Sequence, residues 1–168
     1  MVTPSSASST ERLARVYRAL ETVLDPEIPV LNVLEMGIVA DVHIDESGVT
    51  IDMTPTFAGC PALDVLRREM VEAVRAAGEP SVTVRVVYDP PWTTDRLSEE
   101  ARRKLKAFGL APPGPRCGAQ SLPEIERVPC PYCDSTDTEL ETMFGPTLCR
   151  SIHYCHACRQ SFEHFKAV

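Results

Sequence analysis

The chain has 168 residues, which is enough for one ordinary domain and a smaller second one. Its formal net charge of −7 makes it a poor candidate for binding nucleic acid or an anionic membrane through charge alone. No apolar run is long enough to span a bilayer, and residues 1–9 lack the basic and apolar regions of a signal peptide. We therefore expect a cytoplasmic protein with a disordered tail at residues 1–9 and with its seven cysteines reduced.

The first regular element predicted after this tail is a helix. Apolar residues recur at helical spacing from Leu13 to Leu24, and Ser8 with Glu11 has the spacing of a capping box. Pro26 should end the helix, because the residue before a proline avoids helical geometry.

Strand patterns follow, interrupted by a second helix. Apolar and polar side chains alternate in residues 38–44, 49–53 and 82–86, as in strands with one buried face. A turn at residues 45–48 should make the first two strands antiparallel. Residues 63–77 have apolar side chains at helical spacing. The order α-β-β-α-β predicts an α+β fold, with helices on one face of a small mixed sheet.

The next segments suggest a domain boundary. A last helix is expected at about residues 98–108, with Gly109 as its C-terminal cap. Residues 111–116 are rich in proline and are expected to form a stiff linker. The sequence thus predicts an α/β domain at residues 10–110 and a small C-terminal domain at residues 117–168.

Four cysteines in this C-terminal domain form two C-x-x-C knuckles, Cys130 with Cys133 and Cys155 with Cys158. Four thiolates are the ligand set of a closed, tetrahedral structural Zn²⁺ site, although the 21 residues between the knuckles slightly exceed the usual spacing of roughly 15–20. A rubredoxin-like iron centre is the chemical alternative, and disulfides are disfavoured in a reducing compartment. Metal binding would supply folding energy to a zinc ribbon too small for its own core.

The loop between the second strand and the second helix contains Cys60. Pro61 suits the first turn of a helix, so Cys60 is predicted to be the N-cap, where free N–H groups and the helix dipole favour a thiolate. Thr54 and Thr56 could add hydroxyl donors beside it. The structural alternative is that Cys60 is a small buried residue at a tight turn.

Two further loops carry residues that core and turn requirements do not explain. Asp25, Glu27 and Glu35 place three carboxylates between the first helix and the first strand, where a solvated loop is the simpler interpretation. Trp92, the only tryptophan, and Asp95 follow the third strand and could lie near Cys60. A single tryptophan also commonly closes the edge of a core.

Several of these segments recur together in one known family. They are Asp25-Pro-Glu-Ile-Pro29, Pro55-Thr-Phe-Ala-Gly-Cys-Pro-Ala62, Trp92-Thr-Thr-Asp95, Gly109-Leu-Ala-Pro-Pro113 and, in the tail, Phe144-Gly-Pro-Thr147. Together they closely resemble the PaaD family of phenylacetate degradation, also described as the D or J component of phenylacetyl-CoA epoxidase (1,2-phenylacetyl-CoA monooxygenase). The first domain is also similar to the iron–sulfur cluster assembly domain of SufT-like factors. The usual Asp-Leu-Gly of that domain reads Glu35-Met36-Gly37 here.

The resemblance implies a non-catalytic accessory protein that helps iron–sulfur cluster maturation or maintenance in the epoxidase. The chain lacks the sequence patterns of a di-iron site, a plant-type ferredoxin or a flavin site. The reductase component with its 2Fe–2S cluster is the favoured client. The resemblance assigns Cys60 transient binding of iron or a cluster, with Asp25, Glu27 and Glu35 shaping the site. The zinc ribbon would dock the client or organise a homodimer.

Two other functions compete with this interpretation. A zinc-ribbon module that binds nucleic acid or another protein could use a basic helix face, formed by Arg96, Arg102, Arg103, Lys104 and Lys106. Such faces are usually solvated, and this one belongs to an acidic chain. A thiol enzyme using Cys60 would need a base, but the histidines lie on a strand or in the tail, at His43, His153, His156 and His164.

Overall fold

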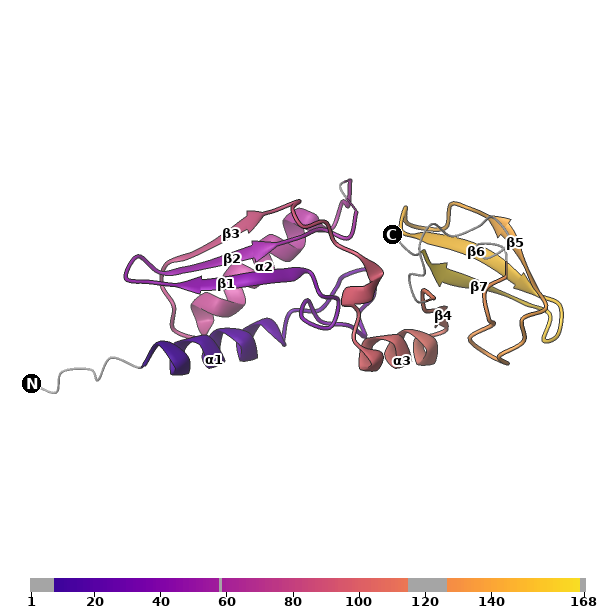
Figure 1. The fold of residues 1–168 in the computed structure, drawn as a ribbon, viewed down its shortest axis with the longest axis horizontal. Coiled ribbons are helices and arrows are strands. Elements are labelled where there is room, and N and C mark those ends of the chain that lie inside the picture. Colours follow the sequence, from indigo (N-terminus) through magenta and orange to yellow (C-terminus); the bar gives the residue numbers. More distant parts are fainter. Residues whose placement is uncertain (1–7, 58, 115–126, 167–168) are drawn as a thin grey trace, which may run out of the picture. The chain divides into compact units, whose positions relative to one another are not determined.

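A computed structural model of the chain describes residues 8–57, 59–114 and 127–166 (Figure 1). These residues form two compact units. The first contains the chain up to Leu34, Ile38–Pro55 and Pro61–Pro91, and the second contains Glu35–Gly37, Thr56–Cys60 and the chain from Trp92 onward. Most of the expected N-terminal tail and of the expected linker lies outside the described residues. Within the described residues, no helix is both long and apolar enough to cross a membrane.

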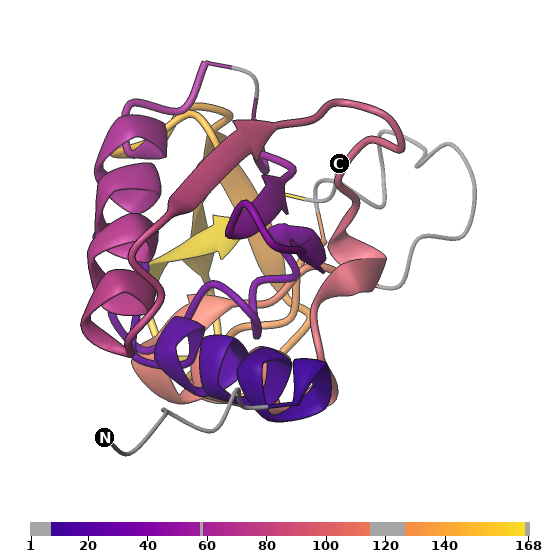
Figure 2. The same cartoon turned by 90° about the vertical axis from the view of Figure 1, so that its left-hand side faces the viewer.

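The first unit begins with helix α1, Ser9–Leu20, which starts with the predicted capping box (Figure 2). The Ser8 hydroxyl accepts a hydrogen bond from the Glu11 N–H at 3.3 Å, and the Glu11 carboxylate accepts one from the Ser8 N–H at 2.9 Å. The expectation that the helix continues to Leu24 is wrong. Leu24 instead pairs with Asn32 in an isolated bridge, because the chain turns tightly after Leu20.

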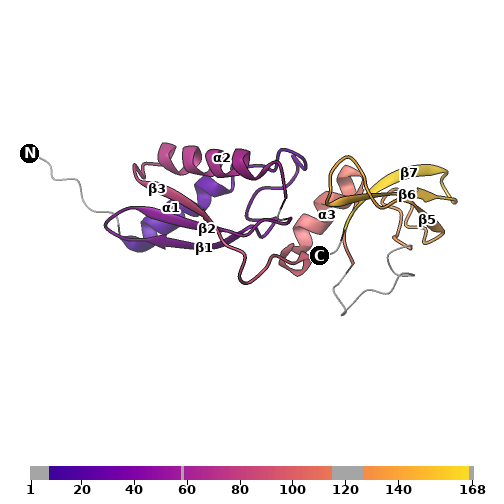
Figure 3. The same cartoon turned by 90° about the horizontal axis from the view of Figure 1, so that it is seen from above.

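The expected mixed sheet is confirmed. Strands β1, Val39–Ile44, and β2, Val49–Met53, are antiparallel, and β3, Val82–Val86, lies parallel to β2 at the other edge. Helix α2, Leu63–Ala76, connects β2 to β3 and lies along the sheet (Figure 3). Helices α1 and α2 pack against each other, α1 also against β1 and α2 also against β3. The buried core between them includes Val16, Leu20, Ile51, Met53, Met70 and Val74.

A buried carboxylate at Glu79 ties α1 to the segment between α2 and β3. Its side chain is only 4% exposed and accepts hydrogen bonds from Arg12 at 2.7 and 3.2 Å and from Arg15 at 2.7 Å. The hydrogen bonds from Arg12 are the main reason that the pKa of Glu79 lies below its usual range, with Arg15 contributing. The first unit therefore contains an ion-pair cluster that stabilises the ionised form of Glu79.

The second unit contains a 3₁₀ turn η1, helix α3 and a four-stranded sheet of order β4-β7-β6-β5. Strand β4 is parallel to β7, and the other pairs are antiparallel. The bounds are Thr94–Arg96 for η1, Glu99–Phe108 for α3, Leu110–Ala111 for β4, Thr138–Thr142 for β5, Arg150–Cys155 for β6 and Gln160–Phe165 for β7. As predicted, Gly109 caps α3, in the left-handed conformation with φ of 89°.

This division differs from the boundary expected at residues 111–116. Ala111 belongs to β4 and pairs with β7, and α3 packs against β4. The helix at the end of the predicted α/β domain is therefore part of the unit that holds the cysteine knuckles. The short segment Glu35–Gly37 also belongs to this second unit.

Trp92 holds that short segment in place. Its indole N–H donates a hydrogen bond to the Met36 carbonyl at 2.8 Å, and its ring meets Phe165 of β7 edge to face at 6.0 Å. Gly37 has φ of +64° and leaves no room for a Cβ atom, which would lie 2.6 Å from the Cβ of Arg96. Trp92 thus closes the core of the second unit and is itself only 3% exposed.

Candidate metal centre

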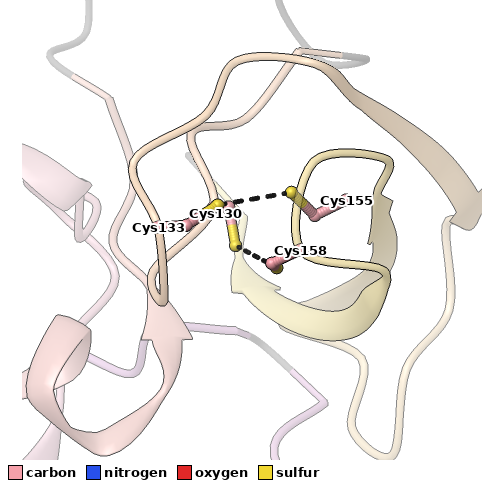
Figure 4. A group of neighbouring side chains, drawn as sticks. All are labelled: Cys130, Cys133, Cys155 and Cys158. Atoms are coloured by element: carbon pink, nitrogen blue, oxygen red, sulfur yellow. Dashed lines mark hydrogen bonds between the residues drawn. The ribbon is translucent and has the colours of Figure 1, made fainter.

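The two knuckles bring all four cysteine thiols together (Figure 4). The Sγ atoms of Cys130, Cys133, Cys155 and Cys158 all lie within 4.8 Å of one another. The Cys130–Cys158 and Cys133–Cys155 distances are 3.7 and 3.6 Å. A tetrahedral ion with metal–sulfur bonds of about 2.3 Å would give edges of about 3.8 Å. A disulfide would need about 2.05 Å between sulfur atoms. The arrangement therefore fits a four-thiolate metal site and does not fit two disulfides.

The two knuckles share one backbone geometry. The residue after each knuckle, Asp134 or Arg159, has φ of 60°. Each donates its N–H to the carbonyl of the first cysteine of its knuckle, Asp134 to Cys130 at 3.0 Å and Arg159 to Cys155 at 2.8 Å. This repeated tight turn directs both thiols of a knuckle to the same side. The duplicated C-x-x-C motif thus folds into two equivalent halves of one site.

Burial and backbone N–H groups act oppositely on these thiols. The N–H of Cys158, with further N–H and thiol donors, lowers the pKa of the Cys155 thiol to about 7. Burial, with the neighbouring thiols, raises the pKa of Cys158 to about 12. Four thiolates this close repel one another strongly unless a cation neutralises them. The site therefore requires a metal ion to hold all four groups ionised.

The metal site also forms much of the hydrophobic core of this region. Cys130 and Cys155 are fully buried and cluster with Ala111, Val128 and Phe162. Only three residues of that cluster are not cysteines. Cross-linking by a metal ion would therefore contribute much of the stability of the ribbon.

The two residues between the knuckles that could have replaced a ligand lie elsewhere. Cys149 places its sulfur 3.1 Å from the Thr147 hydroxyl. His153 is fully buried, and its Nε2 lies 3.0 Å from the Ser151 hydroxyl, which also lies 3.3 Å from Nδ1 of His164. Burial lowers the pKa of both histidines, that of His164 to about 3. They act as a neutral polar pair in the sheet.

The prediction that Cys60 caps α2 is wrong. The helix begins at Leu63, and Ala62 is its N-cap, without a side-chain hydrogen bond. Pro61 and Ala62 form a turn before the helix, while the Cys60 N–H donates to the Phe57 carbonyl at 3.1 Å. The cap position therefore gives no argument for a Cys60 thiolate. Cys60 is half-buried and belongs to the second unit.

The predicted site residues of the first unit have structural contacts. The Asp25 carboxylate is 8% exposed and accepts hydrogen bonds from the N–H groups of Glu27 and Ile28, both at 2.8 Å, which fixes the turn after Pro26. Thr54 is 1% exposed, and its hydroxyl has no hydrogen-bond partner among the described residues. Asp25 thus shapes its own loop, and Glu27 is the half-buried carboxylate beside it.

The second unit contains Glu35, Thr56, Cys60, Trp92 and Asp95. The Glu35 carboxylate lies 2.5 Å from Nζ of Lys104 on α3, with 19% of its side chain exposed. Thr56 is half-buried and Asp95 is exposed in η1. No motif marks the lysine as the partner of Glu35, because 69 residues separate the two in the chain.

The basic face of α3 is largely paired within the second unit. Lys104 contacts Glu35, Lys106 contacts Asp134, and Arg103 contacts Glu100. Arg102 donates to the carbonyls of Thr94 at 2.8 Å and of Pro113 at 2.5 Å. These contacts neutralise or engage the cations on which a nucleic-acid interpretation would depend.

Comparison with known proteins identifies both halves of the chain. Residues 13–86 match the profile of an iron–sulfur cluster assembly protein, and residues 114–166 match that of the PaaD zinc beta ribbon domain. A putative 1,2-phenylacetyl-CoA epoxidase subunit of Escherichia coli, its D component, is 38% identical over 154 residues, covering 91% of this chain and 92% of that protein. The chain belongs to the PaaD family.

Other similar proteins match only the first part of this PaaD-family chain. The Fe–S protein maturation auxiliary factor YitW of Bacillus subtilis is 42% identical over 92 residues, covering 54% of this chain and 89% of that protein. A solved domain of unknown function from Bacillus anthracis is 30% identical, with a TM-score of 0.54, covering 60% of this chain and 97% of that chain. The PaaD resemblance and the SufT-like resemblance of the first domain are thus confirmed.

Proposed function

We propose that this PaaD-family protein is a non-catalytic accessory protein of the multicomponent phenylacetyl-CoA epoxidase, which helps to mature or maintain an iron–sulfur cluster in that complex. The observation that carries the proposal is the presence of an iron–sulfur assembly domain and a PaaD zinc ribbon in one chain. The reductase component, with its 2Fe–2S cluster, is the proposed client. The proposal places the protein in the cytoplasm, where its thiols remain reduced.

The metal of the ribbon is proposed to be zinc with a structural role. Cys130, Cys133, Cys155 and Cys158 would fill all four positions of a tetrahedral ion, as their spacing of 3.6–3.7 Å allows. No position would then be open for water or substrate. The ribbon would serve to dock the client or to join two copies of the chain.

Cys60 is the proposed contact for iron or a cluster in transit. It is half-buried in a loop, and it lies outside the metal site. Glu35 and Trp92 are proposed to hold the neighbouring segment through their contacts with Lys104 and Met36. The other candidates for this client site remain Asp25, Glu27, Thr54, Thr56 and Asp95.

The test compares reductase loading in strains with and without this protein. Deletion should lower the 2Fe–2S content of the purified reductase without removing its polypeptide, and growth on phenylacetate should slow. Cys60→Ser should fail to restore loading, whereas Cys149→Ser, which also changes a half-buried cysteine outside the metal site, should restore it. A fully loaded reductase in the deletion strain would refute the proposed function, and full rescue by Cys60→Ser would refute the role of Cys60.

A further inference from the structure

Strand β3 presents one open backbone edge. Within the described residues its one strand neighbour is β2. The Val49 N–H donates to the Ser81 carbonyl at 2.9 Å, and the Val87 N–H donates to the Met53 carbonyl at 2.8 Å. Because backbone groups alternate in direction along a strand, the odd-numbered residues of β3 face β2. The N–H and C=O groups of Val82, Val84 and Val86 therefore point to the open edge.

A basic groove lies along this edge. Its volume is about 420 Å³, and α2 contributes Arg67, Arg68, Val71 and Arg75 to its lining opposite Val82–Val84. All three arginines are exposed. Two acidic residues of α2 also line the groove, and one of them, Asp64, lies 3.6 Å from Arg67. The groove keeps a positive balance in a chain whose net charge is −7.

One arginine already contacts the open edge. The Arg67 guanidinium donates to the Val84 carbonyl at 3.4 Å, a long hydrogen bond. This contact confirms that the Val84 carbonyl faces the groove. It is weak enough to be exchanged for a hydrogen bond from an incoming strand.

The opposite edge of the same sheet is blunted. Strand β1 has a register shift between Val39 and Asp41, and the Asp41 carboxylate accepts a hydrogen bond from the Val42 N–H at 2.7 Å. Bulges and charged side chains are the usual means of preventing strand addition. Strand β3, by contrast, pairs with β2 in unbroken register over Val82–Val86. The β3 edge is therefore the one suited to accept another strand.

We propose that the β3 edge binds an extended acidic segment of a partner protein. The segment would add a strand beside β3 through the backbone groups of Val82, Val84 and Val86 and would place carboxylates against Arg68 and Arg75. Charge complementarity favours this occupant over a second copy of the chain. Symmetric pairing of two β3 strands would bring two rows of arginines together, and like charges at that distance repel. This inference does not depend on the proposed function.

The test is a titration of the full-length, isotope-labelled protein followed by NMR. The probe is an end-blocked peptide of about eight residues, a common strand length, in which valine and glutamate alternate. The control peptide has lysine in place of glutamate. The glutamate peptide should shift the amide signals of Val82, Val84 and Val86, and its binding should weaken as salt is raised. The lysine peptide should leave them unchanged.

Two double variants complete the test. Arg68→Glu with Arg75→Glu should weaken binding of the glutamate peptide about tenfold, since two attractive contacts become repulsive. Arg18→Glu with Arg103→Glu changes the net charge equally at exposed sites outside the groove and should leave the affinity unchanged. Equal binding of both peptides, shifts centred on β1 or on the second unit, or no shift at about 1 mM peptide would overturn the proposal. Sedimentation showing self-association through β3 would also overturn it, in favour of a second copy.

Discussion

Removing the metal should unfold the second unit and leave the first folded. The core cluster of the ribbon contains three residues besides cysteines, Ala111, Val128 and Phe162. Burial of two large side chains and one alanine contributes about 5 kcal/mol. Zinc binding to four thiolates contributes about 10–16 kcal/mol in small zinc domains. Metal loss therefore removes more stability than the apolar cluster supplies, and the unit cannot remain folded.

Trp92 is the built-in reporter of this event. It is the single tryptophan of the chain, and it lies in the second unit against Phe165, with its indole N–H on the Met36 carbonyl. Chelation should expose the indole and shift its fluorescence emission to longer wavelength. The sequence alone predicts unfolding only after about residue 116. The structure extends the effect to Trp92 and α3, because β4 pairs with β7 and α3 packs on β4.

The assay combines chelation, metal analysis and two optical signals. Helical circular dichroism from α1 and α2 should persist while the tryptophan emission shifts. The control is Glu79→Ala, which weakens the first unit alone and should leave the emission of the metal-loaded protein unchanged under native conditions. If metal analysis shows that the ion has left and the Trp92 emission has not moved, the argument that the metal holds this unit together is refuted.

Three further results are expected. Cys130→Ser should lower bound zinc well below about one ion per chain, measured by elemental analysis, and stoichiometric zinc in this variant would contradict a four-cysteine site. Trp92→Phe should lower the free energy of unfolding by about 1–2 kcal/mol in denaturant titrations, because the Met36 carbonyl loses its hydrogen bond; an unchanged midpoint would contradict that contact. The pKa of Glu79 is lowered on folding, so its contribution is fully present above its ordinary pKa and is lost as pH falls through the folded pKa. Glu79→Gln should accordingly cost about 1–2 kcal/mol at pH 7 and progressively less in acid, and a pH-independent difference would contradict the ion-pair account.

Local patterns in the sequence predict most of the fold and the metal site. The capping box at Ser8, the glycine cap of α3 and the two knuckles each depend on residues only a few positions apart. The predicted end of α1 and the predicted start of α2 are wrong, because apolar spacing continues past Leu20 and because Pro61 precedes the helix by two residues. Periodicity cannot distinguish a buried turn from another helical turn.

Long-range contacts are beyond the reach of sequence patterns. The partners of Glu79, Glu35 and Met36 lie 67, 69 and 56 residues away in the chain. Each contact joins an ordinary surface-type residue to a partner that no motif marks. These contacts determine which loops are rigid and which unit they belong to, and only the folded chain defines them.

The placement of the Glu35-Met36-Gly37 segment changes what the ribbon can do. In the sequence this segment belongs to the assembly domain, where it corresponds to the acidic loop of SufT-like proteins. In the structure Trp92 and Lys104 hold it from the second unit, through Met36 and Glu35 respectively. Trp92 in turn packs on Phe165, in the last strand of the ribbon sheet. Folding of the ribbon around its metal therefore also orders this acidic loop. The ribbon is thus a structural support for the loop of the assembly domain in addition to any docking role.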